Sequence, residues 1–288
     1  MISAFADPLL HESRRTVGRI LAMVRLHRIR RANVGELAVI LKSRRHLSRF
    51  AIAIGNKYLR FHNSEVEILN DQDWLRWERS IESQMNTGVV YLQPPSTYEN
   101  FHGLVSHVCR GQSLRDILVE SSFSINQKFE AIRLAMNALF RLHGFEADWG
   151  NEVHQSISHG DATVNNVIID LIAKTSQWID FDTRHVSHMS ALDRQPDDMR
   201  ALLYSAASHL PQQFHCRLVS ELVEHKPKIS VVNRLGELLR CQWHRFSAFQ
   251  LAQAPLPFKI VVSFTETLLN SIAPLPGESD CKLSKTMR

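Results

Sequence analysis

Glycine and long apolar stretches are both scarce in this sequence of 288 residues. An average usage of ~7% would give about 20 glycines, whereas the chain has 11. It contains neither Gly-x-Gly-x-x-Gly nor Gly-x-x-x-x-Gly-Lys, so both the dinucleotide-binding fingerprint and the phosphate-binding P-loop are excluded. No apolar run reaches the ~18–20 residues that a membrane-spanning helix needs.

Cysteine is also rare, and its four positions are far apart: Cys109, Cys216, Cys241 and Cys281. The lack of a Cys-x-x-Cys pair argues against a zinc ribbon or a disulfide scaffold and favours a reducing compartment. The N-terminus has no uninterrupted apolar core followed by a small-residue cleavage site, which a secretory signal would require. We therefore expect a cytoplasmic protein.

Positive charge is concentrated at the N-terminus. The net charge is +5, and residues 1–31 alone carry seven arginines against two acidic residues. Because the rest of the chain is neutral overall, we expect no nucleic-acid partner. The spacing of the apolar residues between these arginines predicts a basic amphipathic helix over about 13–30. Such a helix suits peripheral contact with the anionic inner face of a membrane.

Local patterns predict a β-rich first part and a helical second part. Short strands are expected at Leu37–Leu41 and Phe50–Ile54, and Tyr58–Phe61 is expected to return as a strand after a turn at Gly55–Lys57. A helix is predicted from about Asp73 to Met85. The other predicted elements are a strand at Leu104–Val108, a loop-and-strand region at 157–181, and helices near 125–143, 197–209, 213–224, 230–246 and 257–272.

One segment carries a chemical pattern. The stretch SHGDATVNNVIID places Asp161 five residues before Asn166, and an apolar-Asp-Phe group follows at Asp180. Phosphoryl transfer needs one carboxylate that accepts a hydroxyl proton, together with an amide oxygen and a second carboxylate that hold Mg²⁺ on the nucleotide phosphates. One loop can present the first two groups, and a β-hairpin through the apolar runs 167–169 and 178–179 would return Asp180 toward them.

These motifs resemble those of the protein-kinase-like superfamily, whose signature is H-R-D-L-x-x-x-N followed by D-F-G. The variant with H-G-D, and without the glycine of D-F-G, is similar to the small-molecule branch, which includes aminoglycoside phosphotransferases, choline kinases and lipopolysaccharide core kinases. The resemblance implies that Asp161 is the catalytic base, that Asn166 and Asp180 are metal ligands, and that His159 braces the loop. Asp182 stands where protein kinases have glycine, so it is then either a second acidic group of the site or a solvated residue without a role in it.

Other stretches follow in the order that the family expects. The strand near residue 105 resembles the hinge of these kinases, which implies that backbone groups at His107 and Cys109 bind adenine. The helix that ends at His143 resembles the L-x-x-L-H that precedes the catalytic loop. The next helix resembles the one whose leading aspartate ties down that loop, and we assign this role to Asp198, with Asp197 as a capping alternative.

The family also expects a lysine that binds the α- and β-phosphates and pairs with a glutamate of the next helix. Glu78, in the predicted helix at 73–85, matches the glutamate. The cation has two candidates near the predicted strand, Arg60 and Lys57. Val39-Ile40-Leu41-Lys42 is similar to the V-A-I-K motif, but 36 residues separate Lys42 from Glu78, so we interpret this match as coincidental.

The resemblance implies an α+β, two-lobed protein-kinase-like fold. Its parts are the basic helix at 1–34, a small β-rich N-lobe at 35–103, a hinge at 104–112, a larger helical C-lobe at 113–276 and a tail at 277–288. The implied activity is that of an ATP- and Mg²⁺-dependent kinase acting on a hydroxyl of a sugar or small molecule. Residues Asp180–Ser205 resemble lipopolysaccharide core kinases most, which favours a lipid-linked glycan such as lipopolysaccharide core as the acceptor. A small atypical protein kinase and a pseudokinase scaffold remain as alternatives.

Overall fold

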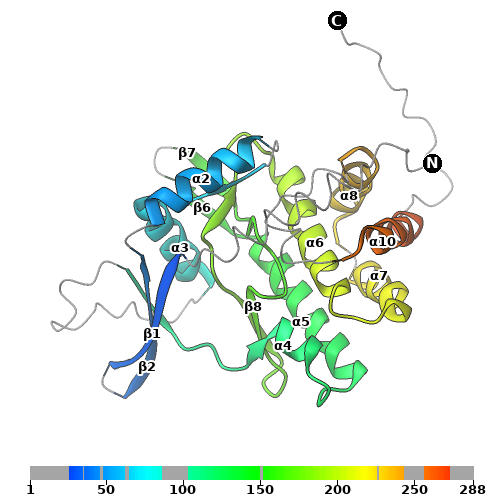
Figure 1. The fold of residues 1–288 in the computed structure, drawn as a ribbon, viewed down its shortest axis with the longest axis horizontal. Helices are drawn as coiled ribbons and strands as arrows, with labels where there is room; N and C mark the ends of the chain where they lie inside the picture. Colours follow the sequence, from blue (N-terminus) through cyan, green and yellow to red (C-terminus); the bar gives the residue numbers. More distant parts are fainter. Residues whose placement is uncertain are drawn as a thin grey trace, which may run out of the picture.

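The structure is a computed structural model that describes residues 26–34, 36–45, 48–61, 65–85, 103–149, 152–225, 227–242 and 256–272. Within these ranges the chain is mixed α+β, with eight helices and four small antiparallel sheets. Figure 1 shows the elements of the first 85 residues together on one side and the helices after residue 190 on the other. None of the described helices combines the length and apolar character that a membrane crossing requires.

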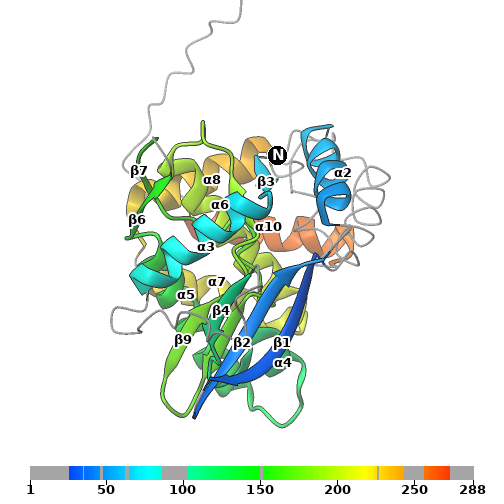
Figure 2. The same cartoon turned by 90° about the vertical axis from the view of Figure 1, so that its left-hand side faces the viewer.

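The first sheet is a β-hairpin extended by a third strand. β1 (His27–Val34) pairs with β2 (Leu37–Arg44), and β2 pairs with β4 (Leu104–His107), so the strands predicted at Leu37–Leu41 and Leu104–Val108 are confirmed. Figure 2 shows β1 and β2 as two long strands facing the viewer, with β4 beside β2. The sheet therefore places residues near position 40 next to residues near position 106.

The predicted N-terminal helix is wrong where it can be compared with the structure. Residues 27–30 belong to β1, and residues 13–25 lie outside the described residues. β1 pairs with β2 along its whole length, from His27 opposite Arg44 to Val34 opposite Leu37. Tertiary pairing of this kind overrides local helical spacing, because the strand gains inter-strand hydrogen bonds at every second residue that the sequence pattern does not report.

A single helix, α2 (Ser48–Phe61), replaces the two strands and the turn predicted after β2. Ile52 and Leu59 are buried and pack against Ile68 of the short strand β3 (Val66–Ile68). These two residues are seven positions apart, which is about two helical turns, so they share one face of the helix. The apolar residues that suggested strands are therefore the buried face of a helix.

The predicted turn residues instead attach this helix to β3. A Cβ atom on Gly55 would lie 2.6 Å from Cδ1 of Ile68, so the glycine permits the close approach of helix and strand. The Asn56 side chain donates to the carbonyl of Ile68 at 2.8 Å and accepts from its backbone N–H at 2.7 Å. Glycine and asparagine are typical of turns, but here both serve helix–strand packing.

The remaining helices follow the predictions closely. α3 (Asp71–Met85) and α5 (Ile125–Leu142) occur as predicted, and α6 (Ala191–Ala207) begins earlier than expected because Ser190 caps it by accepting from the backbone N–H of Asp193. The predicted helices near 213–224, 230–246 and 257–272 correspond to α7 (His215–Glu224), α8 (Ile229–Gln242) and α10 (Phe258–Ile272), and residues 243–246 lie outside the described residues. The other elements are β5 (Gln112–Ser113), α4 (Leu114–Val119), β6 (Glu146–Trp149), β7 (Glu152–Ser156), β8 (Val167–Asp170), β9 (Thr175–Trp178), β10 (Thr183–His185) and the 3₁₀ helix η2 (Gln212–Phe214).

The β8–β9 hairpin joins the main core to the segment that carries the chemical pattern. Val167, Ile169 and Trp178 of this hairpin are buried in the same cluster as Phe129 and Ile132 of α5. The predicted loop-and-strand region at 157–181 is therefore confirmed. Because the hairpin is fixed by core packing, the loop before β8 and the residues after β9 have a rigid support.

Candidate active site

The loop before β8 is held by one buried aspartate of α6. The carboxylate of Asp198 accepts the backbone N–H groups of His159 at 2.7 Å and Gly160 at 2.9 Å, and it lies 3.0 Å from Nε2 of His143. Burial alone would raise the pKa of Asp198, but the His143 hydrogen bond and the neighbouring imidazoles outweigh it and lower the pKa. Asp198, and not Asp197, contacts the loop as predicted.

The glycine of H-G-D is required by the backbone at this point. Gly160 has a φ of +77°, in the left-handed region that residues with side chains avoid. A Cβ atom there would lie 3.0 Å from Cα of Arg184, which follows the site along the chain. The arginine found at this position in the H-R-D motif therefore has no room here, and the loop approaches the backbone of β10 directly.

Asp161 and Asn166 lie in contact on this loop. Nδ2 of Asn166 donates to the backbone carbonyl and to Oδ2 of Asp161, both at 2.9 Å, and both residues are buried. Because the amide nitrogen faces Asp161, the amide oxygen of Asn166 is the atom that can face a cation. The five-residue spacing thus presents a carboxylate and an amide oxygen from one loop.

The backbone of Ile179 connects this loop to Asp180. The carbonyl of Asn166 accepts the N–H of Ile179 at 2.9 Å, and Nε2 of His159 lies 2.9 Å from the carbonyl of Ile179. Asp180, the next residue, has a φ of +69°, an uncommon conformation for a residue with a side chain. The hairpin therefore brings Asp180 back to the loop of Asp161 and Asn166, and His159 braces the junction.

Lys42, near the end of β2, connects three carboxylates. Its Nζ lies 3.0 and 3.1 Å from the two carboxylate oxygens of Glu78, 2.5 Å from Oδ1 of Asp180 and 3.2 Å from Oδ1 of Asp182. Burial would lower the pKa of Lys42, but the negative charges of Asp180, Asp182 and Glu78 raise it well above its ordinary value. The site therefore holds a permanently charged ammonium group.

The predicted pairing of Glu78 with Arg60 or Lys57 is wrong, and so is the interpretation of Lys42 as a coincidental match. Arg60 and Lys57 are exposed on α2. The 36 residues between Lys42 and Glu78 include all of α2, which packs on β3 and returns the chain to the start of α3. Separation along the chain therefore does not measure distance here, and the V-I-L-K pattern is the signal that could have pointed to the lysine.

Two further residues complete the cluster and were not assigned to the site from the sequence. Nδ1 of His27 lies 2.9 Å from Oδ2 of Asp182, and the indole N–H of Trp74 donates to Glu78. The rings of His27 and Trp74 are 4.5 Å apart. Burial lowers the pKa of His27, although Asp182 favours its charged form. His27 was hidden in the predicted helix, and no local pattern marked it.

The donor atoms of this region fit a divalent cation. One ligand atom each from His27, Asp180 and Asp182 lie within 4.8 Å of one another. Mg²⁺ prefers oxygen ligands, whereas an imidazole suits transition metals, so the carboxylates and the Asn166 amide oxygen fit Mg²⁺ better than His27 does. The Asp180 side chain is 43% exposed and that of Asp182 only 14%, so Asp180 is the carboxylate that a bound ligand can reach.

The two predicted adenine contacts lie beside the strand of Lys42. His107 ends β4 opposite Val39 of β2, and Cys109, a half-buried cysteine that forms no disulfide, follows it. The strand pairing thus places the backbone of this segment next to the strand that carries the lysine. Adenine binding by His107 and Cys109 stays a prediction.

No protein-family model matches this chain, and a comparison with curated protein sequences also found no match. The chemistry of the site therefore has to be inferred from its own residues and contacts.

The buried imidazole of His159 makes stability depend on pH. Burial lowers the pKa of His159, although the charge of Asp198 and the Ile179 carbonyl favour the protonated form. Between the ordinary value of ~6.5 and this lowered pKa, the unfolded chain binds a proton that the folded chain does not. The free energy of unfolding is therefore expected to fall as the pH drops below about 6.5.

Denaturant unfolding at pH 7.5 and pH 5.5 tests this expectation. His159→Gln should lose only part of the pH dependence, because burial also lowers the pKa of His27 and of His209, which the variant retains. His188→Gln is the matched control because His188 is exposed, and it should behave like the wild type. Equal pH dependence in His159→Gln and the wild type would contradict the assignment.

Proposed function

We propose that the protein is an ATP- and Mg²⁺-dependent kinase that transfers a phosphoryl group to a hydroxyl of a sugar or another small molecule. The observation that carries the proposal is the position of Lys42 between Glu78 and Asp180, at 3.0 and 2.5 Å. Kinases need a fixed positive charge for the nucleotide phosphates beside a carboxylate that holds Mg²⁺. A lysine–glutamate pair next to a metal-binding aspartate is the arrangement that meets both needs.

Each group then has a role that its contacts support. Lys42 binds the α- and β-phosphates, with Glu78 holding its ammonium group in place. Asn166 and Asp180 hold Mg²⁺, which when bound supplies positive charge to the phosphate oxygens. Asp161 accepts the proton of the acceptor hydroxyl and orients it, because its carboxylate is fixed by Asn166 on the same loop.

The two-lobed kinase-like arrangement is part of this proposal. In it, β1, β2, β4 and α3 form the small lobe, and the helices from α4 to α10 form the large one. Two features support it: the lysine strand β2 pairs directly with β4, which leads into the second half of the chain, and the buried helix α6 anchors the catalytic loop through Asp198. The site then lies between the two groups of elements.

A short connection after the site favours a small acceptor over a protein. After Asp182, the chain forms β10, pairs with β3, and enters α6 at Ala191. Kinases that bind peptides need an activation segment with an A-P-E anchor, and these few residues contain none. This is why a sugar or other small molecule, including a lipid-linked glycan, is the acceptor class that we propose. The cytoplasmic location and the membrane contact of the N-terminal segment stay predictions.

Thermal unfolding with Mg²⁺ and ATP tests the proposal directly. A ligand that binds the folded state stabilises it in proportion to RT ln(1 + [L]/Kd), so the midpoint should rise with the ATP concentration when Mg²⁺ is present. Asp180→Ala should lose the Mg²⁺-dependent part of this rise. Asp116→Ala removes the same charge from an exposed position on α4 and should keep it.

Transfer of labelled γ-phosphate then separates the proposed function from its alternatives. Label in an added sugar or glycan supports the proposal. Label in protein substrates alone would favour an atypical protein kinase. Binding of ATP without any transfer would favour the pseudokinase scaffold, and no Mg²⁺-dependent binding of ATP at all would contradict the whole group of kinase functions.

A further inference from the structure

A cavity lined by arginines lies at the junction of β1, β2, α2 and α3. Its volume is about 680 Å³, and the residues that line it include four arginines and one carboxylate: Arg28, Arg44, Arg45, Arg49 and Asp71. Ser43, Ser48, Trp74 and Leu75 complete the lining. Clustered guanidinium groups that outnumber their acidic neighbours leave a positive potential in a cavity of the size that small ligands occupy.

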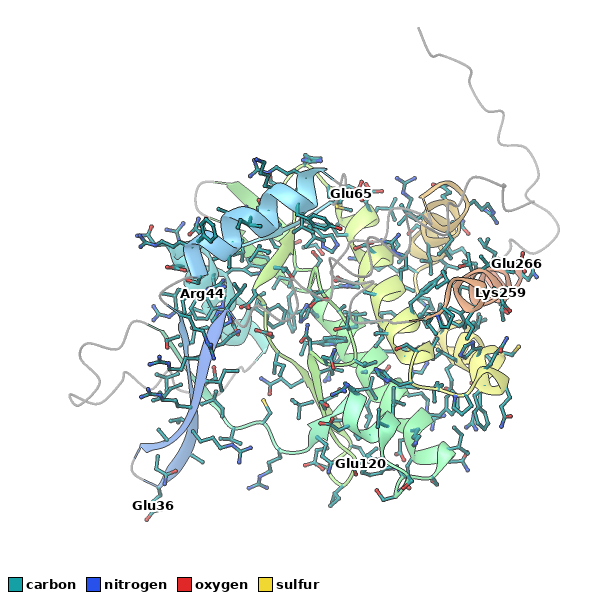
Figure 3. All side chains as sticks on the ribbon, viewed as in Figure 1. Glu36, Arg44, Glu65, Glu120, Lys259 and Glu266 are labelled. Carbon is teal, nitrogen blue, oxygen red and sulfur yellow. The ribbon has the colours of Figure 1, made fainter. Side chains whose placement is uncertain are left out.

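Arg44 is a fixed, buried member of this lining. Its side chain is only 6% exposed, and its guanidinium carbon stacks 4.9 Å above the centre of the Trp74 ring. Nη2 donates to the carbonyl of Leu69 at 3.1 Å, whereas Nε and Nη1 have no hydrogen-bond partner among the described residues. Its acidic neighbour, Asp71, lies 3.8 Å from Nε, beyond hydrogen-bond distance. Figure 3 labels Arg44 at the end of β2, beside the start of α2.

The other three arginines are exposed and can adapt to a ligand. Arg28, on β1, and Arg45, after β2, are exposed lining residues, and Arg45 donates from Nε to the carbonyl of His27 at 3.1 Å. The Arg49 side chain is 89% exposed and lies 3.6 Å from Asp71. Guanidinium groups bind phosphate through two parallel hydrogen bonds, which makes several arginines around one cavity suited to that ligand.

Two helices begin at this cavity and add to its positive potential. Ser48 and Arg49 are the first residues of α2, and Asp71 is the first residue of α3. The N-terminus of a helix carries partial positive charge and favours anions. Asn70 accepts from the backbone N–H groups of Gln72 and Asp73, and the carbonyl of Arg45 accepts that of Ser48, so both helices contribute through their dipoles.

We infer that this cavity binds a ligand that carries a phosphate monoester. The volume exceeds what a phosphate ion alone would fill and suits a small phosphorylated molecule, with the arginines on the phosphate and Leu75 against the apolar part. The inference does not rest on the proposed kinase function, because the cavity contains none of Asp161, Asn166 and Asp180. Trp74 links the cavity to that site, because Nζ of Lys42 lies 5.3 Å from the centre of the Trp74 ring and the indole N–H donates to Glu78.

Isothermal titration of the full chain in EDTA, without nucleotide, tests the inference. The probes are inorganic phosphate, sn-glycerol 3-phosphate, and phosphatidylcholine vesicles with and without phosphatidic acid. Arg49→Gln and Arg28→Gln should each weaken binding of the phosphate probes by about tenfold, because each removes a hydrogen bond to a charged group. Arg60→Gln, on the same helix α2, and Arg30→Gln, on the same strand β1, are matched controls that remove equal charge from exposed positions outside the cavity.

The outcomes answer two questions: whether the site exists, and whether its phosphate belongs to a soluble ligand or to a lipid. Binding of sn-glycerol 3-phosphate that only the cavity variants weaken supports a soluble ligand. Binding restricted to phosphatidic acid vesicles, weakened by the same two variants alone, supports the site with a lipid as the phosphate source. If no probe binds, or if the control variants weaken binding as much as the cavity variants, the inference is wrong. The four substituted residues, Arg28, Arg30, Arg49 and Arg60, are exposed, so each change should alter the free energy of unfolding by only about ±0.5 kcal/mol.

Discussion

Replacing Asp161 by asparagine is expected to lower kcat for phosphoryl transfer by about 100-fold or more, because proton acceptance and positioning of the acceptor are lost together. Asparagine keeps the size and shape of the side chain, so the contact with Asn166 on the loop can be kept by its amide oxygen. Asp198 continues to hold the backbone at His159 and Gly160. Binding of Mg²⁺ and ATP should therefore stay close to that of the wild type.

The measurement is a steady-state determination of kcat and of the KM for ATP, with a thermal unfolding curve for each variant. Asp116→Asn is the control, since it makes the same chemical change at a half-exposed position of α4. Turnover by Asp161→Asn within a few-fold of the wild type would show that this carboxylate is not the base. A large loss with an equally large loss of ATP binding would show that Asp161 acts in nucleotide binding.

Replacing Lys42 by methionine is expected to destabilise the fold by about 3–5 kcal/mol, the usual cost of removing one partner from a buried ion pair. The change leaves Glu78, Asp180 and Asp182 close together without the ammonium group that they share. Methionine fills a similar space, so the loss reports charge more than packing. Lys42→Arg should recover only part, because a planar guanidinium cannot reproduce the three contacts of Nζ.

Urea unfolding in EDTA measures this effect without a cation that could replace the ammonium group. Lys57→Met is the matched control, because Lys57 is exposed on α2 and its loss should change the free energy of unfolding by no more than about 0.5 kcal/mol. The double change of Lys42→Met with Glu78→Gln should cost less than the sum of the two single changes, because they share one interaction. Additive effects, or a greater loss in Lys57→Met, would overturn the role of Lys42.

The loop of Asp161 and Asn166 shows how much of a candidate site can be predicted when its residues are close in sequence. Asp161 and Asn166 are five residues apart, and the hydrogen bonds between them form within the loop itself. The hairpin that returns Asp180 is also local, since β8 and β9 pair across a short turn. Helices such as α3 and α5 were predictable for the same reason, because their apolar spacing reports their buried faces.

Prediction failed at residues 27–34 and 48–61, where short apolar runs fit more than one structure. Over so few residues, the same apolar positions fit both the alternating spacing of a strand and the spacing of a helix. The secondary structure that forms therefore depends on the surface against which each run packs. β1 is a strand because β2 pairs with all of it, and α2 is a helix because one of its faces packs on Ile68 of β3. Because of these errors, the sequence predicts Arg60 or Lys57, and not Lys42, as the cation that pairs with Glu78.

The amino-acid sequence alone was enough to predict which polar groups of the loop and hairpin come together. These groups are only a few residues apart, so their relative positions depend on little more than the local backbone. It could not select the lysine, because the three carboxylates around Lys42 are 36, 138 and 140 residues away along the chain. Nor could it show the cavity, whose lining comes from three separate segments, at residue 28 and within 43–49 and 71–75. Such contacts form only when packing brings distant elements together. Closing the long loops between them costs chain entropy, which is offset by the burial of apolar surface throughout the fold and not by any local pattern.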